Sequence, residues 1–159
     1  CSSLETVICG NNITEIGYCA FWSCTALTNL VLPIKLDSIS EHAFWGCSLL
    51  ANIVIPRSVR KIGNAAFMGC DKLIKTVKGI SYVDKWVVEC DSLVTKVELK
   101  TEIVGVADYA FRGCRSLTSI TYNGTIKEWK NIEKGYGWKD NSGEFTVHCT
   151  DGDLTKEEA

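Results

Sequence analysis

Apolar residues recur along this chain with one long period. Cysteines stand 23 residues apart, three times in succession, at Cys1, Cys24, Cys47 and Cys70. If each cysteine is counted as position 1 of a unit, position 4 is leucine in all four units, and positions 20 and 21 are an Ala-Phe pair in the first three. A period of this length predicts a chain in which similar coils stack on one another to bury their apolar faces.

The first part of each unit predicts a short strand. In the second unit, Leu30 and Leu32 at positions 7 and 9 point inward together because successive strand side chains alternate faces, and position 8 points outward. Pro33 follows directly, where a residue without an amide hydrogen can end a strand. A second extended segment is expected at positions 13 to 16. Phenylalanines at position 21 are expected to form one buried aromatic column, made of Phe21, Phe44, Phe67 and Phe111.

The predicted fold is a repeat solenoid of the leucine-rich-repeat kind, mainly β with short helical turns and wound as a right-handed coil. The array is expected to span residues 1–122. Its units are 1–23, 24–46, 47–69, a variant at 70–90, 91–113 and the start of a sixth unit at Cys114. The variant departs from the pattern after Gly79, where residues 80–88 predict two short β segments around a turn at Asp84 and Lys85.

Residues 123–150 are expected to form a C-terminal cap, because the last turn of a solenoid otherwise exposes its apolar face. Thr125 and Glu128 have the spacing of a capping box ahead of a short amphipathic helix, and residues 144–149 alternate like a final strand. Residues 151–159 are polar and are expected to be frayed. Since Cys1 already lies in register and no cap is predicted ahead of it, we expect either that the chain is part of a longer array or that its first coil is exposed.

The third unit carries a specific resemblance. Its spacing resembles the BspA-like class of leucine-rich repeats, through Cys47, Leu50, Ile53, Ile55, Pro56, Val59, Ile62, Gly63, Ala66, Phe67, Gly69 and Cys70. Residues 122–152 are similar to the closing segment of such arrays in surface proteins of gut bacteria. The resemblance implies a bacterial protein that is secreted or displayed at the cell surface, and that binds or adheres as part of a longer chain.

Composition excludes several classes of partner. The 17 basic and 19 acidic residues are evenly mixed and leave a formal charge of −2, which argues against binding to nucleic acid. No apolar run approaches the roughly 18 to 20 residues of a transmembrane helix. The nine cysteines lack the short spacing of a zinc site. We expect buried free thiols at position 1, and disulfides are the alternative among Cys9, Cys19, Cys90 and Cys149.

No catalytic constellation, cofactor site or metal site is predicted. His42 and His148 are interpreted as ordinary surface or partly buried residues. Cys149 follows His148 directly, but neighbours on a strand face opposite ways, so the pair makes a poor nucleophile and base. Phosphate-binding glycine loops and nucleophile elbows are also missing from the sequence. The chain is therefore predicted not to be an enzyme.

Two rows of outward-facing residues are candidates for binding a protein or glycan ligand. Position 8 supplies an apolar row of Ile8, Val31, Val54 and Val77, although β-branched residues also simply favour strands. Position 22 supplies Trp22, Trp45 and Met68, although these side chains could instead pack between neighbouring coils. The favoured hypothesis is a non-catalytic interaction or adhesion module. The alternatives are a structural spacer in a larger surface protein, or an accessory binding region of a hydrolase.

Overall fold

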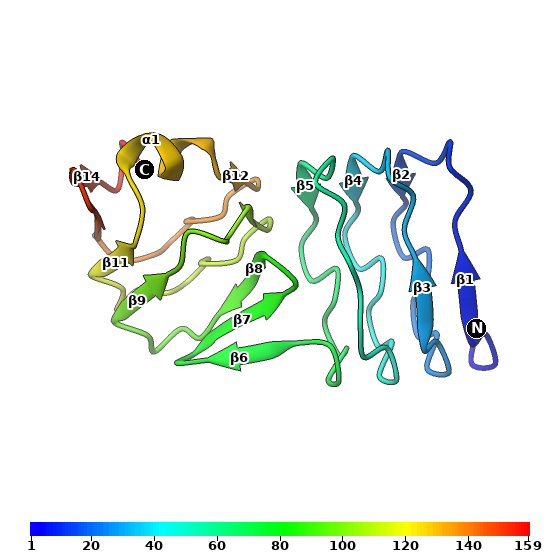
Figure 1. The fold of residues 1–159 in the computed structure, drawn as a ribbon. Coiled ribbons are helices and arrows are strands. Elements are labelled where there is room, and N and C mark those ends of the chain that lie inside the picture. The colour runs from blue at the N-terminus through cyan, green and yellow to red at the C-terminus, as the bar shows by residue number, and fades with distance from the viewer. The chain divides into compact units, whose positions relative to one another are not determined.

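The computed structural model describes residues 1–159 and divides the chain into two compact units. Unit 1 comprises residues 1–75 and 82–84, and unit 2 comprises residues 76–81 and 85–159. Both consist of short strands joined by turns, and the chain has one short helix (Figure 1). The predicted fold class, a mainly β repeat solenoid, is confirmed. Hydrogen-bonded turns take the place of the short helical turns expected between the strands.

In unit 1, equivalent strands of successive coils pair in parallel. Strand β1 (Thr6–Ile8) pairs with β3 (Asn29–Val31), and the register places Thr6 opposite Asn29. A second sheet contains β2 (Glu15–Ile16), β4 (Ser38–Ile39) and β5 (Lys61–Ile62), which lie side by side in Figure 1. All these partners are 23 residues apart, so the period of the sequence is the length of one coil.

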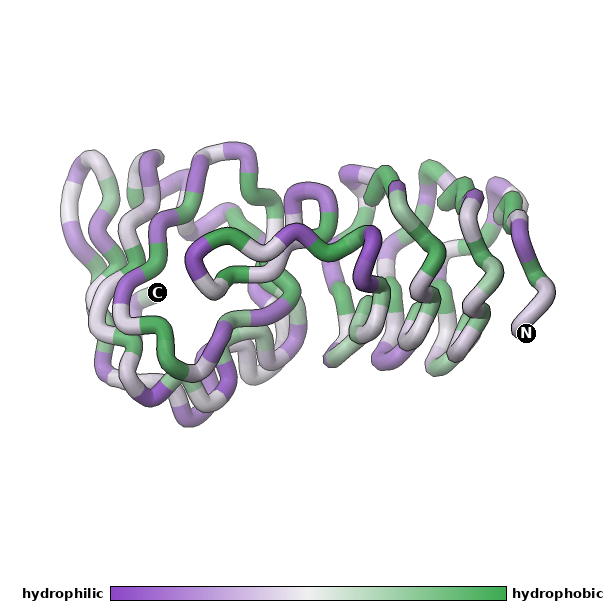
Figure 2. Tube along the Cα trace, turned by 90° about the horizontal axis from the view of Figure 1, so that it is seen from below, coloured by the Kyte–Doolittle hydropathy of each residue, from purple (hydrophilic) through white to green (hydrophobic).

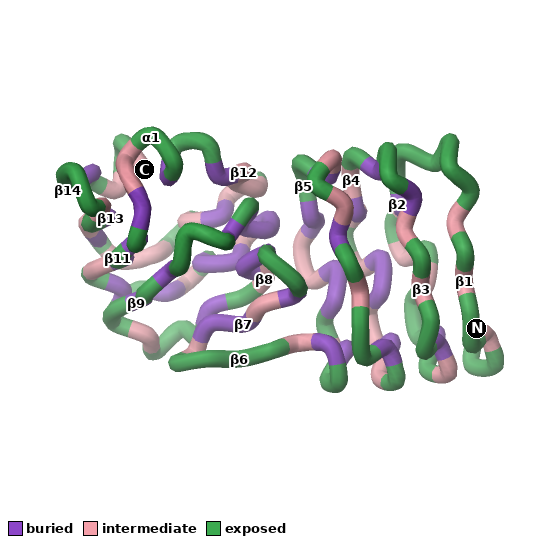
Figure 3. The backbone as a smooth tube through the Cα atoms, viewed as in Figure 1, coloured by how far each residue is buried: buried purple, intermediate pink, exposed green.

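The core of unit 1 is a stack of phenylalanine rings. Phe44 lies between Phe21 and Phe67, with ring centroids 5.2 and 5.4 Å apart and ring planes within 6° of parallel. Hydrophobic segments recur in line along these coils in Figure 2, and buried segments recur with them in Figure 3. The predicted column is present for these three residues. Phe111, its predicted fourth member, is buried in unit 2 and meets Trp138 edge to face at 5.7 Å.

The bends of the coils lie at positions 19 and 23. Cys19, His42 and Ala65 occupy position 19 with φ between 51° and 57°, in the left-handed region that residues other than glycine rarely adopt. At position 23, Gly46 and Gly69 have φ of 74°. At Gly63, in position 17 of the third unit, the backbone closely approaches the backbone of Ser40 and Glu41 in the preceding coil.

Unit 2 contains a parallel sheet of β9 (Lys96–Leu99), β11 (Ser119–Tyr122) and β13 (Thr146–Cys149). A second sheet has the order β12 (Glu133–Lys134), β10 (Gly105–Val106), β8 (Trp86–Cys90), β7 (Ile80–Val83) and β6 (Lys75–Val77). Strands β7 and β8 flank Asp84 and Lys85, which confirms the two β segments predicted in the variant repeat.

Parallel pairing of equivalent strands continues beyond Tyr122, into the segment that the sequence predicts to be a cap. Residue Glu133 pairs in parallel with Gly105, and Thr146 pairs with Ser119, as in the earlier coils. Helix α1 (Ile126–Asn131) is inserted between β11 and β12. The side-chain pattern of the repeat changes after Tyr122 while the backbone ladder continues. The predicted capping box is confirmed, since Thr125 Oγ1 accepts from the Glu128 N–H at 3.2 Å and the Glu128 carboxylate accepts from the Thr125 N–H at 2.8 Å.

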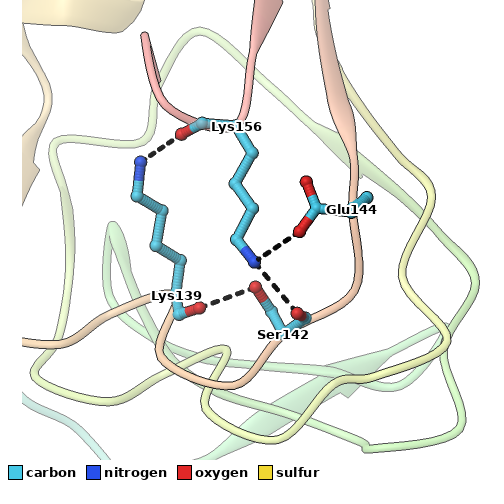
Figure 4. A network of polar contacts seen from close by, with 4 residues as sticks. All are labelled: Lys139, Ser142, Glu144 and Lys156. Atoms are coloured by element: carbon cyan, nitrogen blue, oxygen red, sulfur yellow. Dashed lines mark hydrogen bonds and ion pairs between the residues drawn. The ribbon is translucent and has the colours of Figure 1, made fainter.

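The tail after Thr150 is ordered, which corrects the prediction that residues 151–159 are frayed. Strand β14 (Gly152–Thr155) pairs antiparallel with β13, and this pairing buries Leu154. Two lysines hold the end of the tail (Figure 4). Lys139 Nζ donates to the carbonyls of Lys156 and Ala159, and Lys156 Nζ donates to the Ser142 carbonyl at 3.0 Å. Leu154 stands among polar residues, so the sequence around it gave no indication that this segment pairs with another strand.

Replacing Phe44 by alanine is expected to destabilise the protein by about 3–5 kcal/mol, because its ring is fully buried between two others. The matched variant Phe21→Ala should cost clearly less, since Phe21 is only half-buried. Urea unfolding followed by circular dichroism measures both. Equal losses for the two variants would contradict the stacked core.

Gly63→Ala and Gly17→Ala test the close approach of backbones at position 17. A Cβ at Gly63 would lie 2.4 Å from the Glu41 backbone nitrogen, whereas a Cβ at Gly17 would meet nothing within 4 Å. Because the clash is with backbone, we expect Gly63→Ala to lose about 1–3 kcal/mol. Gly17→Ala should leave the thermal midpoint unchanged or raise it slightly. A tolerated Gly63→Ala would show that the coils are not spaced as described.

Candidate functional site

The residues of the position 8 row all point toward solvent. Ile8, Val31 and Val54 are exposed in unit 1, and Val77 is exposed in unit 2. Strand pairing places Ile8 directly opposite Val31. The third coil forms no strand at Val54, and the neighbouring Ile55 N–H donates to the Asp84 carboxylate at 3.0 Å. Ile8 and Val31 therefore lie side by side in one sheet. Val54 and Val77 are exposed and apolar, but they are not part of that sheet.

The position 22 row contains a stacked pair of indoles. The rings of Trp22 and Trp45 have centroids 5.0 Å apart and planes within 6° of parallel. Trp22 retains 42% of its exposure and Trp45 is half-buried, while Met68 is exposed. Neither indole N–H donates a hydrogen bond within the protein. The rings thus pack between neighbouring coils, as the alternative interpretation held, and they also reach the surface.

His42 completes this cluster, and the sequence interpretation missed it. Its ring lies 4.8 Å from Trp45, 5.5 Å from Trp22 and 5.9 Å from Tyr18, in edge-to-face orientations. We call Tyr18, Trp22, His42 and Trp45 the aromatic ledge. The available signal was the spacing of His42 three residues before Trp45, but the left-handed backbone that turns it toward the indoles could not be anticipated at a non-glycine residue.

Polar groups border the aromatic ledge. Glu41 Oε1 lies 3.7 Å from His42 Nε2 and accepts a hydrogen bond from Asn64 Nδ2 at 3.2 Å. The pKa of Tyr18 is raised, mainly by its hydrogen bond with Cys19 and also by electrostatic repulsion from Cys19 and from the Glu41 carboxylate. The phenol of Tyr18 therefore remains a neutral donor. His42 Nδ1 is buried and has no hydrogen-bond partner. The ledge therefore combines aromatic surface, hydrogen-bond donors and an acceptor carboxylate.

The repeated cysteines are structural groups in this arrangement. All nine are free thiols. Cys47 Sγ donates to the Phe21 carbonyl at 3.2 Å, and Cys70 Sγ donates to the Phe44 carbonyl at 3.0 Å. The hydrogen-bonded contact with Cys47, together with burial, raises the pKa of Cys70 above its ordinary value. A protonated, buried thiol is a weak nucleophile, so Cys70 contributes to packing between the coils.

The neighbours His148 and Cys149 do not form a nucleophile and base. His148 Nδ1 contacts Asp153 Oδ1 at 2.9 Å across the β13–β14 pair. Burial and the carboxylates of Asp151 and Asp153 raise the pKa of Cys149, which disfavours the thiolate form. No group of three or more His, Cys, Asp or Glu side chains has a geometry suited to a metal ion.

Helix α1 covers only Ile126–Asn131, and no helix is long and apolar enough to cross a bilayer.

Several solved structures of repeat proteins are similar to this chain. A leucine-rich cell surface protein from Faecalibacterium prausnitzii is 20% identical, with 91% of this chain and 41% of that one covered and a TM-score of 0.47. A leucine-rich repeat protein from Bacteroides ovatus is 20% identical, with 90% and 50% covered and a TM-score of 0.46. A leucine-rich repeat protein of T. pallidum is 21% identical, with 91% and 72% covered and a TM-score of 0.41. The chain spans half or less of the length of the first two proteins. No curated protein matches it significantly.

The family comparison covers most of the chain. The model described as the BspA type leucine rich repeat region matches residues 1–90 and 87–132 in six copies. The matched region includes the stacked coils of unit 1 and extends through helix α1 in unit 2. The repeats that the sequence indicated and the coils that the structure contains therefore agree, and the chain belongs to the BspA-type leucine-rich repeat family.

Proposed function

We propose that this chain is a non-catalytic recognition module that binds a protein or glycan ligand through the aromatic ledge. The observation that carries the proposal is the stacked pair of Trp22 and Trp45, which reaches the surface with both indole N–H groups unused. Membership of a family of repeat-based surface modules supports display at the bacterial cell surface or secretion. Adhesion is the role that such a surface would serve.

The ledge is suited to binding because its rings are held in place before a ligand arrives. Trp22 and Trp45 stack on each other, and His42 contacts both. Side chains that are already ordered lose little conformational entropy on association, and tryptophans dominate the energy of many interfaces. Further contacts with the ligand are still predicted for Met68 and for the position 8 row, which comprises Ile8, Val31, Val54 and Val77.

The combined variant Trp22→Ala, Trp45→Ala tests the proposal. We expect binding to an array of glycans and host matrix proteins to weaken at least tenfold, because central aromatic residues at an interface typically contribute about 2 kcal/mol or more. Tyr136→Ala is the matched control, since it removes an exposed aromatic ring from unit 2, and it should leave binding unchanged. Circular dichroism should show the same strand content in all variants.

A second outcome would favour the structural-spacer hypothesis. If the unmodified chain binds no glycan and no matrix protein on the array, the recognition proposal is contradicted. Binding that survives loss of both tryptophans would keep recognition but remove the ledge as its site.

A further inference from the structure

We propose that the ligand of the aromatic ledge is a neutral sugar, which stacks on the open aromatic surface and donates a hydroxyl hydrogen bond to Glu41. The inference rests on the proposed function, because it names the chemistry of the ligand that the ledge binds. A pyranose ring has faces made of C–H groups and a rim of hydroxyl groups. Its site therefore needs an aromatic surface beside polar groups that still have free hydrogen-bonding capacity, and the ledge offers both.

The aromatic part of the ledge leaves ring surface open. Trp22 stacks on Trp45 and on no other ring, and its side chain retains 42% of its exposure. Tyr18 is 68% exposed and meets no aromatic ring other than that of His42. The face of an aromatic ring carries the negative part of its quadrupole, so it attracts the weakly positive C–H groups of a sugar.

The polar groups of the ledge are not fully used within the protein. Glu41 Oε1 accepts a hydrogen bond from Asn64 Nδ2 at 3.2 Å, whereas Oε2 accepts none. The indole N–H of Trp22 donates to no group of the protein. A sugar hydroxyl both donates and accepts, so a carboxylate and an N–H at one place can satisfy it. Hydrogen bonds to a charged acceptor are roughly twice as strong as neutral ones, so the bond to Glu41 is the main polar contact.

His42 brings the rings and the carboxylate together. Its ring lies 5.5 Å from Trp22 and 5.9 Å from Tyr18, and its Nε2 lies 3.7 Å from Glu41 Oε1. A single sugar unit on the rings can therefore reach the carboxylate. The hydrogen bond from Asn64 holds Glu41, and stacking on the second indole holds Trp22, so little conformational entropy is lost when the sugar binds.

The polar border of the ledge favours a sugar over a protein partner. A stable protein interface buries about 800 Å² on each side, and contacts around its centre exclude water. Here Glu15 and Glu41 are exposed on the same two coils as the rings, and Ser40 Oγ donates to the Glu15 carboxylate at 2.6 Å. These exposed carboxylates stay hydrated. A sugar is itself surrounded by hydroxyl groups, and it can bind through such water as well as directly.

The carboxylate of Glu41 also separates neutral from acidic sugars. It accepts a hydrogen bond from a hydroxyl group, but it repels the carboxylate or sulfate of an acidic sugar. Because the Glu41 side chain is 47% exposed, water screens part of this repulsion. We expect acidic sugars to bind several-fold more weakly than the neutral sugars from which they derive.

The first experiment offers the full chain two kinds of ligand. One is a set of neutral oligosaccharides of glucose, galactose, mannose and N-acetylhexosamines, and the other is a set of host matrix proteins before and after enzymatic removal of their glycans. We expect binding to neutral oligosaccharides, and to matrix proteins only while their glycans are attached. The combined variant Trp22→Ala, Trp45→Ala should lose both.

The outcomes separate this inference from the recognition function. Binding to deglycosylated matrix proteins that depends on Trp22 and Trp45 would overturn the sugar inference and leave the recognition function standing. If the chain binds neither the oligosaccharides nor the proteins, both proposals fail.

Glu41→Gln tests the hydrogen bond to the carboxylate. The substitution keeps the size of the side chain and its ability to accept from Asn64. Affinity for the neutral oligosaccharide should fall about tenfold, because a charge-assisted bond is replaced by a neutral one. The matched control Glu102→Gln changes an exposed glutamate of unit 2, which pairs with Lys100, and should leave the affinity unchanged. Equal affinities of the unmodified chain and Glu41→Gln would contradict the role of Glu41.

Sialylated forms of the same oligosaccharide distinguish a direct contact from a purely structural role of Glu41. They should bind the unmodified chain more weakly than the neutral form does, and the difference should shrink in Glu41→Gln. A disturbed ledge would instead weaken both forms equally. A preference of the unmodified chain for the sialylated form would overturn the inference of a neutral sugar.

Discussion

Hydrogen bonds between equivalent backbone groups of successive coils are the interaction on which the rest of this structure depends. The Phe21 N–H donates to the Ala43 carbonyl at 2.8 Å, and the Phe44 N–H donates to the Ala66 carbonyl at 2.7 Å. In unit 2 the Phe111 N–H donates in the same way to the Trp138 carbonyl. These bonds set the separation of the coils, and the separation in turn brings identical side chains face to face. The phenylalanine stack, the indole pair and the thiol-to-carbonyl bonds are all products of that spacing.

Much of the fold was predictable because side chains report directly on this spacing. The 23-residue period became the strand register of unit 1, and the capping-box residues Thr125 and Glu128 form the bonds that their spacing predicted. The path of the chain after Tyr122 was not predictable. There the backbone ladder continues while the side-chain pattern that reveals it is lost, and the burial of Leu154 depends on a partner strand rather than on its own neighbours.

The candidate site was only half visible in the sequence, for a physical reason. Trp22 and Trp45 share a repeat position, so their proximity follows from the period. His42 occupies a different position, and it reaches the indoles through a left-handed backbone that it shares with Cys19 and Ala65. Because cysteine, histidine and alanine have so little in common, the sequence does not indicate that these three residues share a left-handed backbone. Position 19 is consequently a place where the coil dictates the backbone and leaves the side chain open to variation.

The helix between β11 and β12 shows how such a protein can change. Paired residues on β10 and β12, such as Gly105 and Glu133, lie 28 residues apart rather than 23, and their strands still pair. Extra chain has been accommodated between the strands of one coil, and the ladder still forms. The segment that joins two strands of one coil can therefore change in length without a matching change in the neighbouring coils. An array built in this way can diversify its outline by local insertions while each coil keeps the same partners.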